Sequence, residues 1–571
     1  MAPSLKPAMP DSPKSSTDWA GIGWLYLFFW FFSGPIQIIL LPTTGTTGFR
    51  DVFFLSFIWL APVFLFPRWT RQASAVIGII LWGSSVISLG YFIIYRQEFS
   101  RSVIFTLFES NFKETSEYLT QYVSFPLIAG TAVFTLVALL LWRRLRPVHL
   151  PRSRAFVLSA FFVLANIAYP YAGYPYAKFS GENFSFKNAT EKLQRRMEPA
   201  APWQLITGYI QYRGIINTIK DILEKNSSLP PLENLVDING DTPRTLILVI
   251  GESTTSRRMS LYGYPRKTTP HLDALKERGE LIVFNDVITS RPFTIEALQQ
   301  ALSFADQEEP RRFLTEPNLM NLMKQAGYKS FWITNQQTMS HRNTLLTMFS
   351  LQADKAVHMN QQRRQNTRQY DEIVFEPFAD ALKDSAPKKF IVLHLLGTHS
   401  NYAYRYPEKY ERFTRRTHVP PVLTDRQTEI YNSYDNAILY NDFVVSSLIE
   451  SFRQTRERGF LLYFSDHGEE VFDEPPHQVL GRNEDAPTRN MYAIPFMLWM
   501  PPGWKRIPDT GAVCARKYSN AHFIHTWSDM AGLSYDRFRP ELSLVNPDFK
   551  PRTRWIGNPE TGLRDFDALP P

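Results

Sequence analysis

Acidic and imidazole side chains follow apolar runs of this sequence, at the points where β-strands are expected to end. Glu252 follows one such run, and Asp466 and His467 follow another. Because the carboxyl ends of parallel strands meet at one edge of a sheet, these side chains can converge. Carboxylate oxygen and imidazole nitrogen are typical ligands of zinc in proteins. The sequence therefore predicts a zinc site built from the ends of separate strands.

Three further histidines lie near expected strand ends. His394 and His399 follow a third apolar run, and His477 lies shortly after the Asp466–His467 pair. A lone histidine is more often a hydrogen-bonded structural residue than a metal ligand. Here, however, residue types that bind zinc occur at three expected strand ends, and this combination favours a metal site over a purely structural role.

Hydroxyl residues after the expected strand 282–287 could supply a nucleophile. Thr289, Ser290 and Thr294 lie there, and Pro292 precedes a helical pattern of apolar residues. The N-terminus of a helix favours anions such as phosphate, and a bound metal lowers the pKa of a hydroxyl. Thr294 or Ser290 could instead only cap the helix. The spacing predicts phosphoryl chemistry but does not choose among the three hydroxyls.

The elements that must position these residues form an α/β pattern from residue 242 onwards. Short, continuous apolar runs alternate there with helical patterns, which indicates a largely parallel sheet covered by helices on both faces. In such a sheet the active site lies at the carboxyl ends of the strands. The expected strands are 245–250, 282–287, 330–334, 390–396, 460–465 and 494–500.

The N-terminal third has a different composition, because long segments of it contain no Asp, Glu, Lys or Arg. A helix needs about 20 apolar residues to cross a bilayer, and five such segments in close succession are not expected of a soluble core. We therefore predict an α-helical membrane domain of five transmembrane helices. Their expected ranges are 20–41, 52–67, 73–95, 125–142 and 155–176.

Lys and Arg are distributed unevenly among the loops of this domain. The N-terminal tail and the loops after the second and fourth predicted helices contain nine of them, whereas the two other loops contain four. Positive loops stay inside, so the N-terminus is predicted inside and the chain after residue 177 outside. The stretches 96–124 and 203–223 have apolar residues at helical spacing, and we expect them either in the membrane interface or packed on the soluble domain.

Composition excludes several other classes of protein. The 571 residues include one cysteine, so neither an internal disulfide nor a four-cysteine zinc site can form. The net charge of +8 would fit nucleic-acid binding, but part of it lies in the inside loops, and no zinc-finger or RNA-binding signature is present. We expect no nucleic-acid partner. His522 and His525 lie in an amphipathic helical pattern, which favours a core helix.

Longer motifs surround the candidate residues. They are GES at 251–253, SLYGYPRKTTP at 260–270, HLLGTH at 394–399, YRYP at 404–407 and FSDHGEE at 464–470. Together they resemble the bacterial inner-membrane phosphoethanolamine transferases of the alkaline phosphatase and sulfatase superfamily. SRPFTIEALQQ at 290–300 and PAAPWQ at 199–204 are similar to the branch that modifies the phosphorylated heptose of the lipopolysaccharide core. A helical anchor with an outward catalytic domain fits this family too, so the resemblance covers nearly the whole chain.

The resemblance implies roles for individual residues. It implies a metal site at Glu252, Thr294, Asp466 and His467, with Thr294 as the nucleophile. His399 and His477 match outer histidines of the family, which bind a second metal or the substrate phosphate. One zinc ion, or two, is the expected cofactor. Residues expected to support the metal or to bind substrate are His394, Asn335, Glu469, Tyr404 and Arg405.

The sequence departs from related patterns in two places. Lipid A-directed relatives have cysteines flanking the nucleophile, but Ser290 and Ala301 lie in that neighbourhood here and the only cysteine is Cys514. This difference favours a core-sugar acceptor. The sulfatase signature begins at Ser290, but Thr294 replaces its arginine, which argues against a formylglycine sulfatase.

The resemblance implies zinc-dependent transfer of phosphoethanolamine from phosphatidylethanolamine to a phosphate of the lipopolysaccharide core, through a covalent phosphothreonine. We expect residues 1–178 to form the transmembrane domain, 179–241 interfacial helices and a linker, and 242–571 a periplasmic catalytic domain of alkaline phosphatase and sulfatase type. The expected location is the inner membrane, with the N-terminus in the cytoplasm. We expect the protein to be a monomer. Alternatives are transfer to lipid A, a related phosphoglycerol transferase or phosphodiesterase, and a non-enzymatic membrane sensor.

Overall fold

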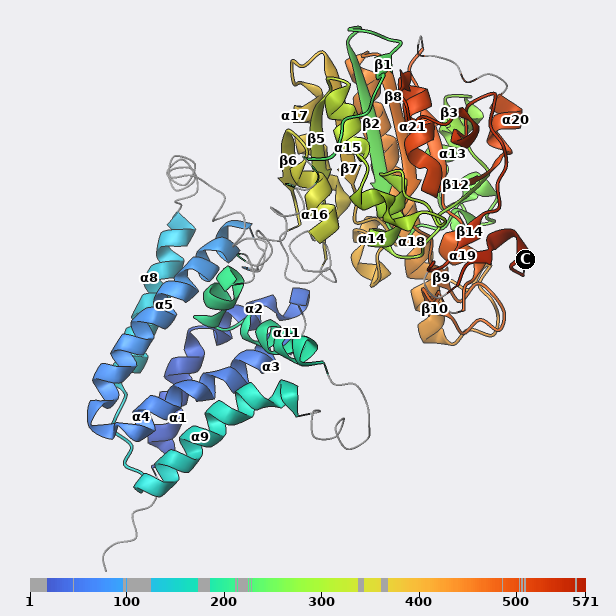
Figure 1. Ribbon diagram of the computed structural model, residues 1–571. Coiled ribbons are helices and arrows are strands. Elements are labelled where there is room, and N and C mark those ends of the chain that lie inside the picture. The colour runs from blue at the N-terminus through green and yellow to red at the C-terminus, as the bar shows by residue number, and fades with distance from the viewer. Residues whose placement is uncertain are drawn as a thin grey trace, which may run out of the picture. The chain divides into compact units, whose positions relative to one another are not determined.

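The chain forms two compact units in the computed structural model, Met1–Arg213 and Gly214–Pro571 (Figure 1). The first is helical and the second is an α/β domain. The structure describes residues 18–44, 46–95, 99, 125–172, 185–210, 213, 224, 226, 228–336, 344–360, 368–484, 486–502, 504, 507, 510–559 and 562–570.

Apolar helices make up the first unit, as predicted. Among the described residues, four helical stretches are long and apolar enough to cross a membrane, and there are up to five if one bent pair counts as a single span. Large apolar side chains such as Ile79, Phe125 and Phe156 are exposed on these helices, as expected where a helix faces lipid. The four stretches are Gly48–Leu65, Pro67–Ile93, Phe125–Arg143 and Arg152–Tyr171.

The bent pair corrects the expected single helix 20–41. Helices α1 (Trp19–Phe31) and α2 (Gly34–Thr44) are separated by a short break, and the axes of Trp19–Phe31 and Gly34–Leu41 differ by 63°. Pro35 explains the break, because it lacks the N–H that would continue the helix. The other helices of this unit are α3 (Thr46–Leu55), α4 (Leu60–Leu65), α5 (Thr70–Tyr95), α8 (Phe125–Arg143), α9 (Arg152–Ala168) and α11 (Phe186–Met197).

The two stretches expected at the interface are described only in small part. Of 96–124 the structure describes Phe99, and of 203–223 it describes 203–210 and Arg213. The first of these two expectations therefore lies almost wholly outside the described residues, and the second lies partly outside them.

A seven-stranded sheet with the strand order β3-β11-β8-β2-β7-β5-β6 forms the centre of the second unit. Only β11 runs antiparallel to its neighbours within this sheet, so the predicted, largely parallel sheet is confirmed. The strands are β2 (Arg244–Gly251), β3 (Leu281–Val283), β5 (Lys329–Thr334), β6 (Lys355–His358), β7 (Lys388–His394), β8 (Gly459–Ser465) and β11 (Phe496–Trp499).

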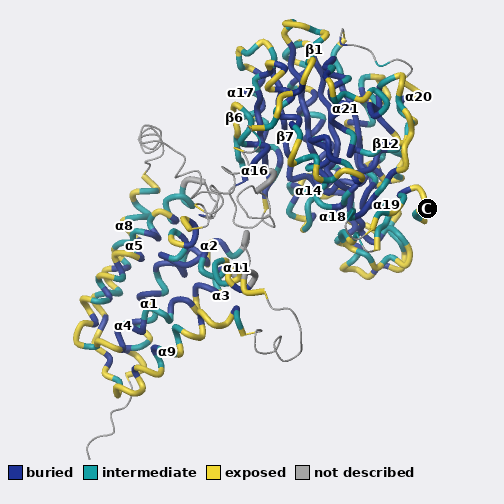
Figure 2. Tube along the Cα trace, in the orientation of Figure 1, coloured by how far each residue is buried: buried dark blue, intermediate teal, exposed yellow. Residues whose placement is uncertain are grey.

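Both faces of the sheet are covered, which explains the continuous apolar runs of its strands. All eight residues of β2 are buried. Leu248 packs in one apolar cluster with Trp527 of α21 (Phe523–Ala531), whereas Val249 packs in a second cluster with Ile438 of α18 (Asp425–Thr455). Figure 2 shows the buried sheet in dark blue between more exposed outer surfaces.

The expected strand 282–287 is two short strands. The residue after β3, Phe284, donates its N–H to Phe496 of β11, but the next residue, Asn285, donates to the carbonyl of Cys514. The chain thereby leaves the main sheet, and β4 (Asp286–Ile288) pairs in parallel with β12 (Lys517–Ser519). The apolar pattern also does not predict β6, because its four residues mix charged and apolar side chains.

Buried arginines hold the segment after β2 to α18. Arg258 Nε and Nη2 donate to Asp435 Oδ1 at 2.9 and 2.6 Å, and Nη1 donates to Asp473 Oδ1 at 2.8 Å. Arg266 Nη1 donates to the other oxygen of Asp435 at 2.7 Å. Loss of one partner from a buried ion pair is strongly destabilising, so this network fixes the loop that begins at Glu252.

Candidate metal centre

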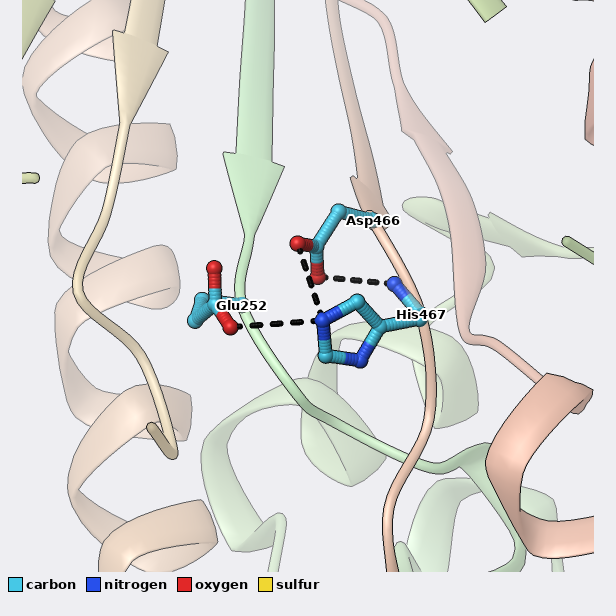
Figure 3. Close-up of side chains that lie close together, drawn as sticks. All are labelled: Glu252, Asp466 and His467. Atoms are coloured by element: carbon cyan, nitrogen blue, oxygen red, sulfur yellow. Dashed lines mark hydrogen bonds and ion pairs between the residues drawn. The ribbon is translucent and has the colours of Figure 1, made fainter. Parts of the chain in front are cut away.

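Glu252, Asp466 and His467 meet at the carboxyl ends of β2 and β8 (Figure 3). Each side chain offers a ligand atom, and these atoms all lie within 4.8 Å of one another. The three residues are at most 1% exposed. Gly251 of β2 pairs with Ser465 of β8 in a parallel register, so the residues that follow the two strands leave the sheet at the same level.

The hydrogen bonds of His467 leave a lone pair facing the carboxylates. Its Nδ1 lies 2.9 Å from the Gly468 carbonyl oxygen, which can only accept, so Nδ1 carries the proton. Nε2 lies 3.4 Å from Glu252 Oε1 and 3.3 Å from Asp466 Oδ2. Asp466 Oδ2 is buried and has no hydrogen-bond partner among the described residues. Lone pairs of three side chains therefore face one another, and Arg482 Nη1 also approaches that of His467 Nε2.

The electrostatics of the cluster favour a bound cation. Burial raises the pKa of Asp466 well above its ordinary value, and the negative charge of Glu252 raises it further. Burial and the charge of Arg482 lower the pKa of His467, so its imidazole is neutral at neutral pH. Two buried carboxylates this close ionise together only when a cation neutralises them. This donor set fits a zinc ion, which binds carboxylate oxygen and imidazole nitrogen.

The backbone after β2 holds Glu252 toward the other two residues. Ser253 has a φ of 56°, a left-handed conformation that non-glycine residues rarely adopt. Its N–H donates to Asp466 Oδ1 at 3.0 Å, its hydroxyl donates to Glu252 Oε1 at 2.8 Å, and its carbonyl accepts from the Tyr434 hydroxyl. Gln336 Nε2 donates to Glu252 Oε2 at 3.0 Å. Strain held in place by several hydrogen bonds is typical of functional sites.

Thr294 is the hydroxyl residue that lies against this cluster. It is the first residue of α14 (Thr294–Ala301). Its Oγ1 donates to Glu252 Oε2 at 3.1 Å and lies 3.3 Å from His467 Nε2. The hydroxyl thus shares the space that faces the two candidate ligands, beside the N-terminus of a helix.

The other two hydroxyls of the same loop are engaged elsewhere. Ser290 is buried and donates to Gln300 Oε1, while Thr289 donates to the Arg291 carbonyl at 3.2 Å. The spacing of the sequence leaves the three hydroxyls equivalent, and these hydrogen bonds distinguish Thr294 from the other two.

The outer histidines differ in their surroundings. Burial lowers the pKa of His399 to about 4, and the negative charge of Glu252 opposes this shift. His394 ends β7, burial lowers its pKa to about 4, and its Nε2 has no hydrogen-bond partner among the described residues. His477 Nδ1 donates to the Phe472 carbonyl at 2.8 Å, a contact within its own loop.

Asp371 organises the loop that leads to His399. Its Oδ1 accepts from the backbone N–H of Leu396 and from Asn335 Nδ2, and its Oδ2 accepts from the N–H of Gly397, each at 2.8 Å. Asn335 therefore contacts the cluster only indirectly. Asp371 lies in a short helical turn away from any expected strand end, so no local pattern singles it out.

Two other candidate residues lie around this loop. Arg405 is buried, and its Nε donates to the His399 carbonyl at 3.2 Å. Tyr404 is half-buried, and the guanidinium carbon of Arg368 lies 5.3 Å from its ring centre. Arg405 thus holds the backbone of His399, whereas Tyr404 contacts the side chain of Arg368.

Arg482 reaches the cluster, although nothing in the spacing of the sequence indicates it. Its Nη1 donates to His467 Nε2, its Nε lies 3.3 Å from Glu469 Oε2, and its guanidinium lies over the Phe293 ring. Glu469 is buried, its pKa is raised to about 7 by burial, and it accepts a hydrogen bond from the Tyr402 hydroxyl at 3.1 Å. Sequence reasoning misses Arg482 because it lies in a loop rather than at a strand end.

Known proteins resemble this chain over nearly its full length. The sequence profile of the sulfatase family matches residues 244–533. The chain is 55% identical to phosphoethanolamine transferase EptC of Escherichia coli O18:K1:H7, over 98% of this chain and 97% of the relative. It is 54% identical to phosphoethanolamine transferase CptA of Salmonella typhimurium, with the same coverage. The C-terminal periplasmic domain of Escherichia coli EptC, crystallised in complex with Zn, matches with a TM-score of 0.58 and 59% identity, over 60% of this chain and 98% of that one.

Asp466→Asn is expected to abolish zinc binding and to stabilise the metal-free protein. Asparagine keeps the shape of the side chain but removes a buried carboxylate that, without a cation, must either be protonated or be repelled by Glu252. Zinc at about 100 times its Kd should raise the free energy of unfolding of the wild type by about 2.7 kcal/mol and leave the variant unchanged. Thermal melts with zinc or a chelator and elemental analysis of the purified protein measure both effects.

Glu469→Gln is the matched control, because Glu469 is equally buried but lies outside the three-residue cluster. This variant should bind zinc as the wild type does. Wild-type zinc content in Asp466→Asn would contradict the assignment of Asp466 as a ligand.

Proposed function

The chain belongs to the sulfatase family and is a phosphoethanolamine transferase, and we propose that it transfers phosphoethanolamine from phosphatidylethanolamine to a phosphate of the lipopolysaccharide core. The observation that carries this proposal is the Thr294 hydroxyl, which lies 3.1 Å from Glu252 Oε2 and 3.3 Å from His467 Nε2. A nucleophile beside a metal-binding cluster and a helix N-terminus suits attack on a phosphate ester.

The reaction proceeds in two displacements at Thr294. Zinc bound by Glu252, Thr294, Asp466 and His467 would lower the pKa of the hydroxyl and neutralise charge on the phosphoryl group. Thr294 Oγ1 loses its proton and forms a bond to the phosphorus of phosphatidylethanolamine, the bond from phosphorus to the glycerol oxygen breaks, and that oxygen takes up a proton as diacylglycerol leaves. An oxygen of the acceptor phosphate then attacks the same phosphorus, and the bond to Oγ1 breaks.

In this proposal Arg482 binds the phosphoryl group. Its Nη1 touches His467 Nε2, and Glu469 Oε2 lies 3.3 Å from its Nε, so the guanidinium is held at the edge of the cluster. A guanidinium binds two oxygens of a phosphate through parallel N–H groups. Positive charge at that edge would stabilise the oxygens that become more negative during transfer.

The proposed acceptor and location are supported by the sequence together with the relatives. Full-length similarity to EptC and CptA supports phosphoethanolamine transfer. The lack of cysteines beside Thr294 favours a core acceptor, since the one cysteine of the chain is Cys514. The apolar helices of Met1–Arg213 anchor the enzyme in a membrane. We place the N-terminus in the cytoplasm and the catalytic unit in the periplasm, next to both amphiphilic substrates, because the loops rich in Lys and Arg belong inside.

Thr294→Ala is expected to lower the transfer rate by at least about 10³-fold, because the nucleophile is lost. Wild-type protein incubated with phosphatidylethanolamine should gain the mass of one phosphoethanolamine on the peptide that contains Thr294, and the variant should not. Peptide mass spectrometry and a lipid-based transfer assay provide the two readouts.

Ser290→Ala and Thr289→Ala are matched controls from the same loop, since both hydroxyls are bonded away from the cluster. Both variants should still acquire the adduct. A phosphoethanolamine group found on another residue, or transfer that persists in Thr294→Ala, would disprove the covalent route through Thr294.

Arg482→Ala is expected to lower kcat by about 10²- to 10³-fold, the typical cost of losing one group that stabilises transition-state charge, with zinc content unchanged. Arg482→Lys keeps the charge but not the paired N–H groups, so its kcat should lie between those of Arg482→Ala and the wild type. Steady-state kinetics and elemental analysis separate the two effects. Loss of zinc in parallel with activity would instead assign Arg482 to the assembly of the metal centre.

A further inference from the structure

Two adjoining cavities lie beyond the C-terminal end of α14, the helix that begins at Thr294. Their volumes are about 370 Å³ and about 200 Å³. They share Asp306, Ala521 and His522 in their walls, so we treat them as one side cavity. The larger part alone falls within the range of about 300–1,000 Å³ that is usual for small-molecule sites.

The side cavity adjoins the loop that carries the nucleophile. Gln307 lines its larger part and donates from Nε2 to the Ser290 carbonyl at 3.0 Å. Ser519 also lines it and pairs with Ile288, shortly before that loop. Ser290 and Thr294 are four residues apart, so their Cα atoms are separated by at most about 14 Å. An oligosaccharide of a few sugar units can cover this distance.

Two arginines in the walls of the side cavity have no acidic partner among the described residues. Arg539 lines the smaller part and Arg552 the larger part, and both residues are exposed. No carboxylate of the described residues lies within 4.0 Å of either guanidinium, whereas Arg312 and Arg537 in the same walls each have an acidic partner. Two free guanidinium groups are suited to phosphate, which they bind through paired N–H groups.

The histidines of the cavity are neutral and can donate hydrogen bonds. His525 Nδ1 accepts from the backbone N–H of Arg539 at 3.3 Å, so Nε2 carries the proton of the neutral ring. Burial lowers the pKa of His525 to about 3 and that of His522 to about 4, and the charges of Arg539 and Arg552 contribute to both shifts. The expectation of a core helix fits His525, which is buried on α21, whereas His522 precedes α21 and lines the cavity.

The remaining walls offer the groups that sugars need. Trp555 is half-buried and lines the larger part, where its flat apolar ring can pack against the face of a sugar. Asp306 and Glu308 line the same part and can accept hydrogen bonds from sugar hydroxyls. A cavity with free arginines, an aromatic ring and carboxylates matches an oligosaccharide that carries phosphate groups better than a lipid chain or a bare anion.

We propose that the side cavity is the acceptor subsite and binds a phosphorylated oligosaccharide, with Arg539 and Arg552 on phosphate groups and Trp555 against a sugar ring. The inference rests on the proposed function, because it gives a place to the acceptor of that reaction. An acceptor held there directs one phosphate oxygen to the phosphorus on Thr294. The new oxygen–phosphorus bond forms as the bond to Oγ1 breaks, and Thr294 regains a proton.

The test separates the two half-reactions of the full-length enzyme in detergent. The double variant Arg539→Ala/Arg552→Ala should acquire the phosphoethanolamine adduct from phosphatidylethanolamine at the wild-type rate. Its KM for a phosphorylated core oligosaccharide, released from lipopolysaccharide by mild acid, should rise at least about 10-fold, the usual effect of losing a hydrogen bond to a charged group. Trp555→Leu should raise the same KM while leaving adduct formation unchanged.

Arg426→Ala, on an exposed position of α18 outside the cavity walls, is the matched control and should change neither half-reaction. A wild-type KM for the oligosaccharide in the double variant would overturn the acceptor subsite, and so would loss of adduct formation in that variant. Failure of the wild type itself to form an adduct would instead refute the proposed function, so the two failures are distinguishable.

Discussion

Two carboxylates and one imidazole lie buried together, and their lone pairs face one another. Glu252 and Asp466 can both be ionised there only with a cation between them and His467. The paired ends of β2 and β8 create this arrangement, because their parallel register brings the residues after both strands to the same level. The strained backbone at Ser253 is held by the same residues. The Thr294 hydroxyl lies beside this cluster, so a cation bound there would lower the pKa of that hydroxyl.

The charged groups around the cluster have separate roles. Arg482 supplies positive charge at the edge of the cluster, and Glu469 holds its guanidinium. Asp371 acts at a distance by fixing the backbone of the loop that leads to His399. The guanidinium groups of Arg539 and Arg552 in the side cavity lie outside this network, which would suit the proposed binding of an acceptor after diacylglycerol has left.

Strand ends could be predicted from the sequence, because a continuous apolar run that stops at Glu252 or Asp466 is a local signal. Arg482 and Asp371 could not be predicted, since both lie in loops and their contacts join parts of the chain that are far apart in sequence. The division of 282–287 into two strands is likewise decided by two different partner segments. Local patterns thus predict which elements form and which residues end them, whereas the contacts between loops require the folded structure.

X-ray absorption at the zinc K-edge measures the ligands of the cation directly, on the full-length protein loaded with one equivalent of zinc. The arrangement of Glu252, Asp466, His467 and Thr294 predicts one imidazole nitrogen at about 2.0–2.1 Å and otherwise only oxygen ligands. A spectrum with two or more imidazole ligands would contradict it, because the ion would then be held by histidines such as His399 and not between the two buried carboxylates.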